Sequence, residues 1–124
     1  MTLSQSARRY VRRNGRTMTL RQWTPTGDTD AYNDPEYELD TTPVTGVASS
    51  ANAGKQISIR GQGHQLDREI YLSVDAPTVR DATASDVDRP DEIVLDGRTY
   101  QAVFVTRPGN GLQEIQAELM RDDH

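Results

Sequence analysis

The chain has 124 residues, of which 34% are hydrophobic and 27% are charged, so it has room for one domain with a small apolar core. The absence of cysteine excludes disulfides, thiolate nucleophiles and cysteine-ligated zinc. No apolar run approaches the roughly 20 residues that a membrane span needs, and the N-terminus lacks the apolar segment of a signal peptide. These features favour an intracellular or assembled soluble protein.

Charge is distributed unevenly along the chain. Residues 1–21 contain six arginines and no acid, a local charge of +6, whereas the remaining 103 residues carry −11 and the whole chain carries −5. Thirteen arginines stand against a single lysine, Lys55. An acidic, aspartate-rich and lysine-poor composition is typical of haloarchaeal proteins, and a GC-rich genome, which also favours arginine over lysine, is the alternative explanation.

Residues 1–16 are predicted to form a basic arm that contains a short helix over residues 2–14. Leu3, Ala7 and Val11 recur on one helical face, and Asn14-Gly15 is a stop signal. The apolar stripe is narrow, so helicity in isolation should be marginal, and the arm is expected to order on another molecule.

The arginines of this arm are the candidate partner-binding side chains, since arginine pairs bidentately with phosphate and carboxylate groups. They are Arg8, Arg9, Arg12, Arg13 and Arg16. A solvated helix face, or pairing with the chain's own acidic loops, is the alternative role for these residues.

Residues 17–124 are predicted to form a single β domain. Short strands are expected over residues 17–24, 44–48, 56–60, 69–74, 92–95, 98–106 and 114–120. Turns are expected at residues 24–27 and 61–64, with flexible loops near residues 25–36, 48–56 and 75–91. Six or seven short antiparallel strands separated by such signals indicate a mainly β fold, a small β-barrel or sandwich.

The clearest element is a hairpin in which Asp96-Gly97 joins strands 92–95 and 98–106, because a type I′ turn favours this dipeptide. Strict alternation predicts a core face made by Ile93, Leu95, Tyr100, Ala102 and Phe104. The opposite face would then carry Val103 and Val105, which are the candidate subunit-interface residues. Alternatively, another layer of the same chain covers these two valines.

No catalytic, cofactor-binding or metal-ligating set is predicted. The two histidines lie in a glycine-rich turn (His64) and at the terminus (His124), without a nucleophile motif nearby. The acidic stretch 28–34 fails as an EF-hand because Tyr32 and Asn33 occupy positions that need an oxygen ligand and a glycine. No enzyme activity and no cofactor are expected.

The pattern as a whole resembles the head-tail connector proteins of tailed viruses, which are also called head completion or stopper proteins. The resemblance lies in a basic N-terminal segment leading to a first strand (GRTMTLRQW), a flexible middle, a hairpin of the form D-x-I-x-x-D-G-x-x-Y-x-V-x-x-V matched at residues 91–105, and a final strand (EIQAELM). Ala102 departs from the motif, where an aliphatic residue is commoner. Together with the composition, the resemblance suggests a haloarchaeal siphovirus.

The resemblance implies a virion protein, assembled in the host cytoplasm, that forms a ring below the portal or its adaptor after genome packaging. The ring, commonly a dodecamer, would close the channel around the packaged double-stranded DNA and present a platform to a tail-completion or tail protein. No membrane partner is implied. The candidate loop facing the channel is residues 48–63. Its candidate residues, together with the histidine that follows it, are Ser49, Ser50, Asn52, Lys55, Arg60 and His64.

Two alternatives remain open from the sequence. A tail-completion or tail-terminator protein is also a small β-rich ring protein, and it would be found with free tails rather than with tailless heads. An OB-like nucleic-acid-binding module is the second alternative, and it would need exposed aromatic side chains for base stacking.

Overall fold

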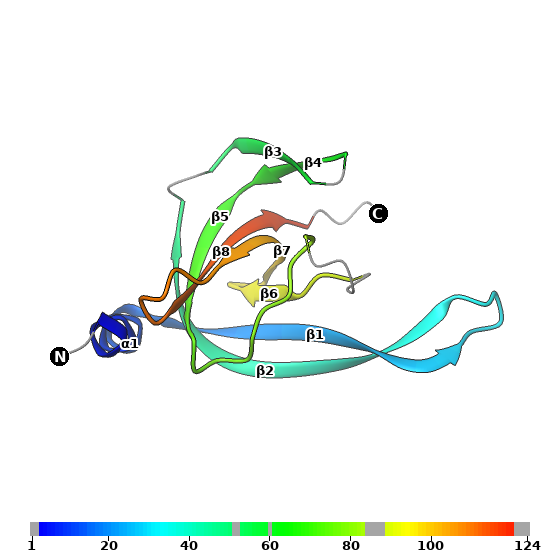
Figure 1. The fold of residues 1–124 in the computed structure, drawn as a ribbon, viewed down its shortest axis with the longest axis horizontal. Helices are drawn as coiled ribbons and strands as arrows, with labels where there is room; N and C mark the ends of the chain where they lie inside the picture. The colour runs from blue at the N-terminus through cyan, green and yellow to red at the C-terminus, as the bar shows by residue number, and fades with distance from the viewer. Residues whose placement is uncertain (1–2, 51–52, 60, 84–88, 121–124) are drawn as a thin grey trace.

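The computed structural model describes residues 3–50, 53–59, 61–83 and 89–120, and it shows a mainly β protein built around a closed barrel (Figure 1). The elements in chain order are α1 (Leu3–Asn14), β1 (Arg16–Thr29), β2 (Pro35–Ser49), β3 (Lys55–Ile59), β4 (Gln62–Leu66), β5 (Arg68–Ser73), β6 (Glu92–Leu95), β7 (Arg98–Thr106) and β8 (Leu112–Leu119). Six strands close antiparallel in the order β1-β2-β5-β8-β7-β6, and β3 pairs with β4 in a separate two-stranded sheet. The predicted fold class is confirmed, in its barrel form.

The interior of the barrel is filled by alternate side chains of all six strands. The fully buried members with the largest side chains are Met18, Leu20, Ile70, Leu72, Ile93 and Ile115. Period-two alternation places these residues on the inner face and the polar residues between them on the outer face. The final strand is confirmed, since Ile115 and Ala117 are buried and Leu119 packs against the same cluster.

The predicted β6–β7 hairpin is confirmed to the residue. Ile93 pairs with Tyr100 and Leu95 pairs with Arg98. The turn residues Asp96 and Gly97 both have positive φ, 53° and 76°, as a type I′ turn requires.

The predicted face assignment fails at the far end of β7 because the strand contains a β-bulge. The register with β8 shifts between Ala102 and Phe104, so the inward–outward alternation changes phase at that point. Phe104 is therefore 40% exposed, whereas Val103 is fully buried and Val105 packs against the core. Predicting Phe104 as core was wrong, and Val103, expected at a subunit interface, is covered by the chain itself. Val105 is only partly buried, and its contact with another subunit stays a prediction.

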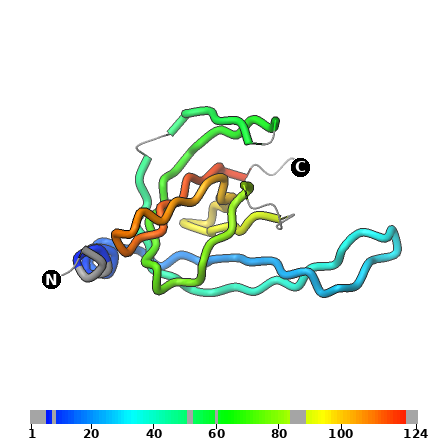
Figure 2. Tube along the Cα trace, in the orientation of Figure 1, coloured from blue at the N-terminus to red at the C-terminus, as the bar shows by residue number. Residues whose placement is uncertain are grey.

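The first two strands are longer than the sequence indicates, and they run out of the barrel as a hairpin (Figures 1 and 2). The chain does not turn at residues 24–27: β1 continues to Thr29, and the turn lies between Asp30 and Asp34. Pro25 is tolerated because at that point β1 pairs only with β2, at Tyr37, and its other edge needs no backbone donor.

Two further segments differ from the predictions. Residues 62–64, expected in a turn, belong to β4 (Gln62–Leu66), which places His64 opposite Ile57 of β3. The helix is not a free arm: Val11 is buried, and α1 contacts β2, β5 and β8 at one end of the barrel. Its predicted stop is confirmed, with the Gly15 amide donating to the Val11 carbonyl at 2.8 Å.

Candidate assembly surfaces

The hairpin that leaves the barrel, residues 24–40, is here called the acidic arm. Every residue of it is exposed except Tyr37, which is half-buried. It carries six carboxylates and no basic side chain: Asp28, Asp30, Asp34, Glu36, Glu38 and Asp40. Tyr32 at the tip is 86% exposed and Leu39 is 42% exposed, so the acidic arm also presents apolar surface.

The turn at the tip of the acidic arm is closed by one carboxylate. Asp30 Oδ1 accepts the amides of Tyr32 at 2.8 Å and of Asp34 at 3.0 Å. This carboxylate therefore stabilises the turn itself, as short polar side chains commonly do. Among the described residues no group of three or more potential ligands could hold a metal ion.

The basic helix α1 lies at the opposite end of the molecule's long axis from the acidic arm (Figure 1). Arg9, Arg12 and Arg13 are exposed on it, and the side chain of Arg8 lies outside the described residues. Arg16, at the start of β1, pairs with Asp96 at 2.8 Å on the surface. The molecule therefore has a basic end and an acidic end, a polarity that the charge counts indicate but do not place in space.

The candidate channel loop is in large part a two-stranded sheet anchored to the barrel. Ser49 ends β2, Ser50 follows it, and Lys55 begins β3, whereas Asn52 and Arg60 lie outside the described residues. Of these candidate loop residues in the described part of the chain, Ser50 and Lys55 are exposed and Ser49 is half-buried.

His64 is not a solvent-exposed turn residue, and this expectation was wrong. Its Nδ1 lies 3.1 Å from Glu118 Oε1 of β8, with the imidazole 11% exposed. The other oxygen of Glu118 accepts the Gln65 amide at 2.7 Å. Glu118 therefore ties β4 to β8, beside the contacts of Asp67, whose amide donates to the Ala117 carbonyl and whose Oδ2 accepts the Leu119 amide.

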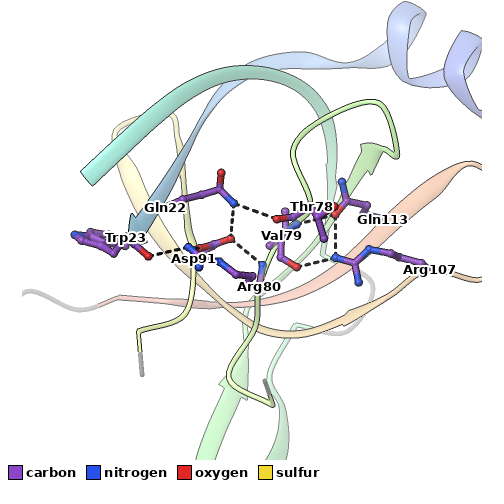
Figure 3. A network of polar contacts seen from close by, with 8 residues as sticks. All are labelled: Gln22, Trp23, Thr78, Val79, Arg80, Asp91, Arg107 and Gln113. Carbon is purple, nitrogen blue, oxygen red and sulfur yellow. Dashed lines mark hydrogen bonds and ion pairs between the residues drawn. The ribbon is translucent and has the colours of Figure 1, made fainter. Parts of the chain in front are cut away.

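The long loop between β5 and β6 is fastened across one side of the barrel by buried polar side chains (Figure 3). Asp91 is fully buried and accepts from Gln22 Nε2 at 2.9 Å, the Arg80 amide at 2.8 Å and the Arg80 guanidinium at 3.3 Å. The same guanidinium donates to the Trp23 carbonyl at 2.8 Å. Buried carboxylates are stable only when satisfied in this way, so Asp91 has a structural role.

A second buried side chain, Gln113 of β8, holds the start of the same loop. Its oxygen accepts the Val79 amide at 2.9 Å, and its nitrogen donates to the Pro77 carbonyl at 3.1 Å. Arg107 donates to the Val79 carbonyl at 2.7 Å (Figure 3). Further along the loop, Asp81 Oδ2 accepts the Val105 amide at 2.6 Å, next to the bulge in β7.

Sequence reasoning missed a pocket on the outer wall of the barrel, here called the arginine pocket. It has a volume of about 730 Å³. Its charged lining residues are Arg21, Arg89, Glu92 and Arg98. The uncharged lining residues are Gly97, Thr99, Leu119 and Met120. The arginines come from β1, the loop before β6 and the start of β7, so no sequence spacing brings them together. Only the antiparallel pairing of β1 with β6 places Arg21 opposite Glu92.

Trp23 organises this pocket. Its ring is 5% exposed and lies under two guanidinium groups, with Arg89 Cζ 3.9 Å and Arg21 Cζ 5.2 Å from its centroid. Such stacking orients arginine while leaving its edge donors available. Burial raises the pKa of the Glu92 carboxyl above its ordinary value, and the charges of Arg21 and Arg89 oppose that shift.

No helix in the described part of the chain is long and apolar enough to cross a membrane. No protein-family model matches the sequence, and no curated protein matches it. Among solved structures, the chain is similar to one titled "Virion of native gene transfer agent (GTA) particle", with a TM-score of 0.48 and 18% identity over 85% of this chain and 94% of the other. A likeness of this degree assigns no function to the chain, so the function has to be argued from its own surfaces.

Proposed function

We propose that this chain is a structural virion protein that assembles as a ring at the head–tail interface of a tailed virus. The ring closes the portal channel after DNA packaging and gives the tail its attachment platform. It does no chemistry. The motif-level resemblance at residues 91–105 supports the family, and the acidic arm supports assembly.

The acidic arm is the observation that carries the proposal. An isolated two-stranded hairpin is marginally stable at best in water. Beyond Trp23, β1 and β2 pair with each other and with no other described strand, and their side chains are exposed except that of Tyr37, which is half-buried. A ribbon of this length, with Tyr32 86% exposed at its tip, gains stability when it lies against another subunit.

The two ends of the molecule suggest its orientation in the neck. The exposed arginines of α1 suit an acidic surface on the portal or adaptor, since arginine pairs bidentately with carboxylates. The β3–β4 sheet, which Glu118 ties to the barrel, is the candidate element toward the channel. A dodecamer matches the commonest portal symmetry in the family that the sequence resembles.

Electron microscopy of particles assembled without this protein tests the proposal. DNA-filled heads that leak and carry no tails are the expected result, and sealed, tailed heads would overturn it. Accumulation of free tails whose ends lack a terminal ring, beside sealed heads, would assign the tail-completion role instead.

The role of the helix is tested separately by replacing Arg9, Arg12 and Arg13 with glutamine. The variant should still fold and self-associate, because these side chains are exposed, but it should no longer bind purified heads. A matched variant with lysine at the same three positions keeps the charge and should retain most of the binding. Equal head binding by the glutamine variant would contradict the proposed docking role.

The proposed haloarchaeal host predicts a specific salt response. At low salt, the excess of acidic side chains repels itself and destabilises the compact state. Thermal unfolding should therefore shift to markedly higher temperature between dilute buffer and molar KCl. A melting temperature that is highest in dilute buffer would favour the GC-rich explanation of the composition.

A further inference from the structure

We propose that the acidic arm of one copy docks in the arginine pocket of the next copy, so that the subunits join head to tail. This inference rests on the proposed ring and specifies the contact between its neighbouring subunits. The two surfaces are different parts of one chain, so the contact is heterologous. Repeated around an axis, such a contact closes a ring.

The arginine pocket has the chemistry of a carboxylate receptor. Three guanidinium groups, those of Arg21, Arg89 and Arg98, line it against the single carboxylate of Glu92. Glu92 is 6% exposed, and its side chain makes no hydrogen bond or close ion pair within the described part of the chain, so it leaves the donors of the neighbouring arginines available. With Arg21 and Arg89 stacked on Trp23, their donors are oriented in advance, which reduces the entropic cost of binding.

The acidic arm complements this pocket in both charge and apolar surface. Its six carboxylates are exposed on a two-stranded ribbon, and Tyr32 and Leu39 add apolar area beside them. The pocket offers Leu119 and the exposed side chain of Met120 next to its arginines. Arginine with apolar neighbours is the composition that protein interfaces favour at their centres.

A second copy is a better occupant than the chain's own arm or a nucleic acid. Six residues of β1 beyond Trp23 extend the acidic arm by about 20 Å at the usual rise of a strand, and Figure 1 shows it leading away from the barrel. It cannot fold back onto the wall from which it starts without breaking its own pairing. A nucleic acid would approach a chain with a net charge of −5 whose acidic arm begins next to the pocket.

Engineered cysteines test the contact directly, because the chain has none of its own. Tyr32→Cys labels the tip of the acidic arm and Thr99→Cys labels the pocket. The chain carrying both changes should give, after oxidation, a ladder of covalent oligomers up to the ring copy number. Each single variant should give at most dimers. A matched chain with Tyr32→Cys and Lys55→Cys, on the exposed start of β3, should give no ladder.

Charge reversal supplies an independent measurement. Arg98→Glu should weaken self-association at least roughly tenfold in sedimentation velocity, and Asp28→Arg with Glu36→Arg should do the same. Mixing the two variants should restore association, since the reversed charges meet at alternate contacts. Arg13→Glu, a charge reversal on the exposed face of α1, is the control and should leave self-association unchanged.

The outcomes separate this inference from the proposed ring. Rings that form without a Tyr32–Thr99 ladder, and that ignore charge reversal at Arg98, would overturn the docking contact and leave the ring standing. A chain that stays monomeric at every concentration and salt would overturn both. Binding of a DNA duplex that Arg98→Glu abolishes, with self-association unchanged, would assign the pocket to nucleic acid and refute the proposal.

Discussion

The burial of Asp91 makes it the side chain whose loss should cost this fold most among its charged groups. Replacing Asp91 with alanine removes the acceptor for Gln22 Nε2, the Arg80 amide and the Arg80 guanidinium. Breaking a buried charge pair by removing one partner costs about 3–5 kcal/mol. That is a large share of the total stability of roughly 5–15 kcal/mol expected for a small domain.

Asp96 provides the matched control because it also pairs with an arginine. The Arg16–Asp96 distance is shorter, 2.8 Å against 3.3 Å for Arg80–Asp91, yet the Asp96 side chain is 65% exposed and that of Asp91 is fully buried. Exposed pairs contribute about 0–1 kcal/mol. Asp96 has φ 53° in the hairpin turn, a backbone conformation that asparagine tolerates and alanine disfavours, so the control substitution is Asp96→Asn. It should change stability by less than about 1 kcal/mol, despite the shorter contact.

Urea unfolding followed by circular dichroism measures both variants, with the free energy of unfolding taken by linear extrapolation. Asp91→Asn keeps the shape and costs less, about 1–3 kcal/mol, because a donor then faces the Gln22 or Arg80 donors. It remains measurable if Asp91→Ala does not fold. A loss for Asp96→Asn equal to or greater than that for Asp91→Asn would refute the argument that burial, and not distance, sets the strength of these contacts.

Three further predictions concern the barrel. Glu92→Gln should raise stability at neutral pH, because burial raises the pKa of the Glu92 carboxyl. The protonated carboxyl favours the folded state below the ordinary glutamate pKa of 4.5, and this stability is lost as pH rises through the raised pKa of the folded state. The stability that glutamine adds, measured by thermal unfolding, should therefore vanish in acid. Val103→Ala should cost about 2 kcal/mol in urea and Phe104→Ala less than about 0.5 kcal/mol, and the reverse order would contradict the bulge. Gly46→Ala should cost about 1–3 kcal/mol by calorimetry, because its Cβ would lie 2.6 Å from Leu72 Cδ2, and an unchanged melting temperature would show that the wall yields.

The elements that could be predicted from the sequence are those whose signal is local. The Asp96-Gly97 turn needs only its own dihedral angles, and the alternation of Ile115, Ala117 and Leu119 needs only one buried face. The β4 strand was missed because residues 62–66 have no such alternation: Gly63 and His64 pair with β3 through their backbone.

The errors at Pro25 and Val103 have a different cause, which lies in the partner strands. A proline is tolerated in a strand where its nitrogen faces an unpaired edge, and which edges are unpaired is set by the barrel order. A bulge is likewise a relation between two strands, and the sequence of β7 alone carries no mark of it. The arginine pocket was missed for the same reason, since Arg21, Arg89 and Arg98 meet only when the barrel closes.

The shortness of β6 has a consequence for how the barrel opens. Past Gln101, the edge of β7 that faces β6 has no described strand beside it, and the β5–β6 loop supplies the bonds. The Ala102 amide donates to the Asp91 carbonyl, the Ala82 amide donates to the Ala102 carbonyl, and Asp81 Oδ2 accepts the Val105 amide. This part of the wall is held by irregular backbone and one carboxylate, so it should be the first part of the barrel to open locally. The amides of Ala102 and Val105 would then exchange with solvent sooner than those of the continuous ladder between β5 and β8, and their rates would report when the wall comes apart.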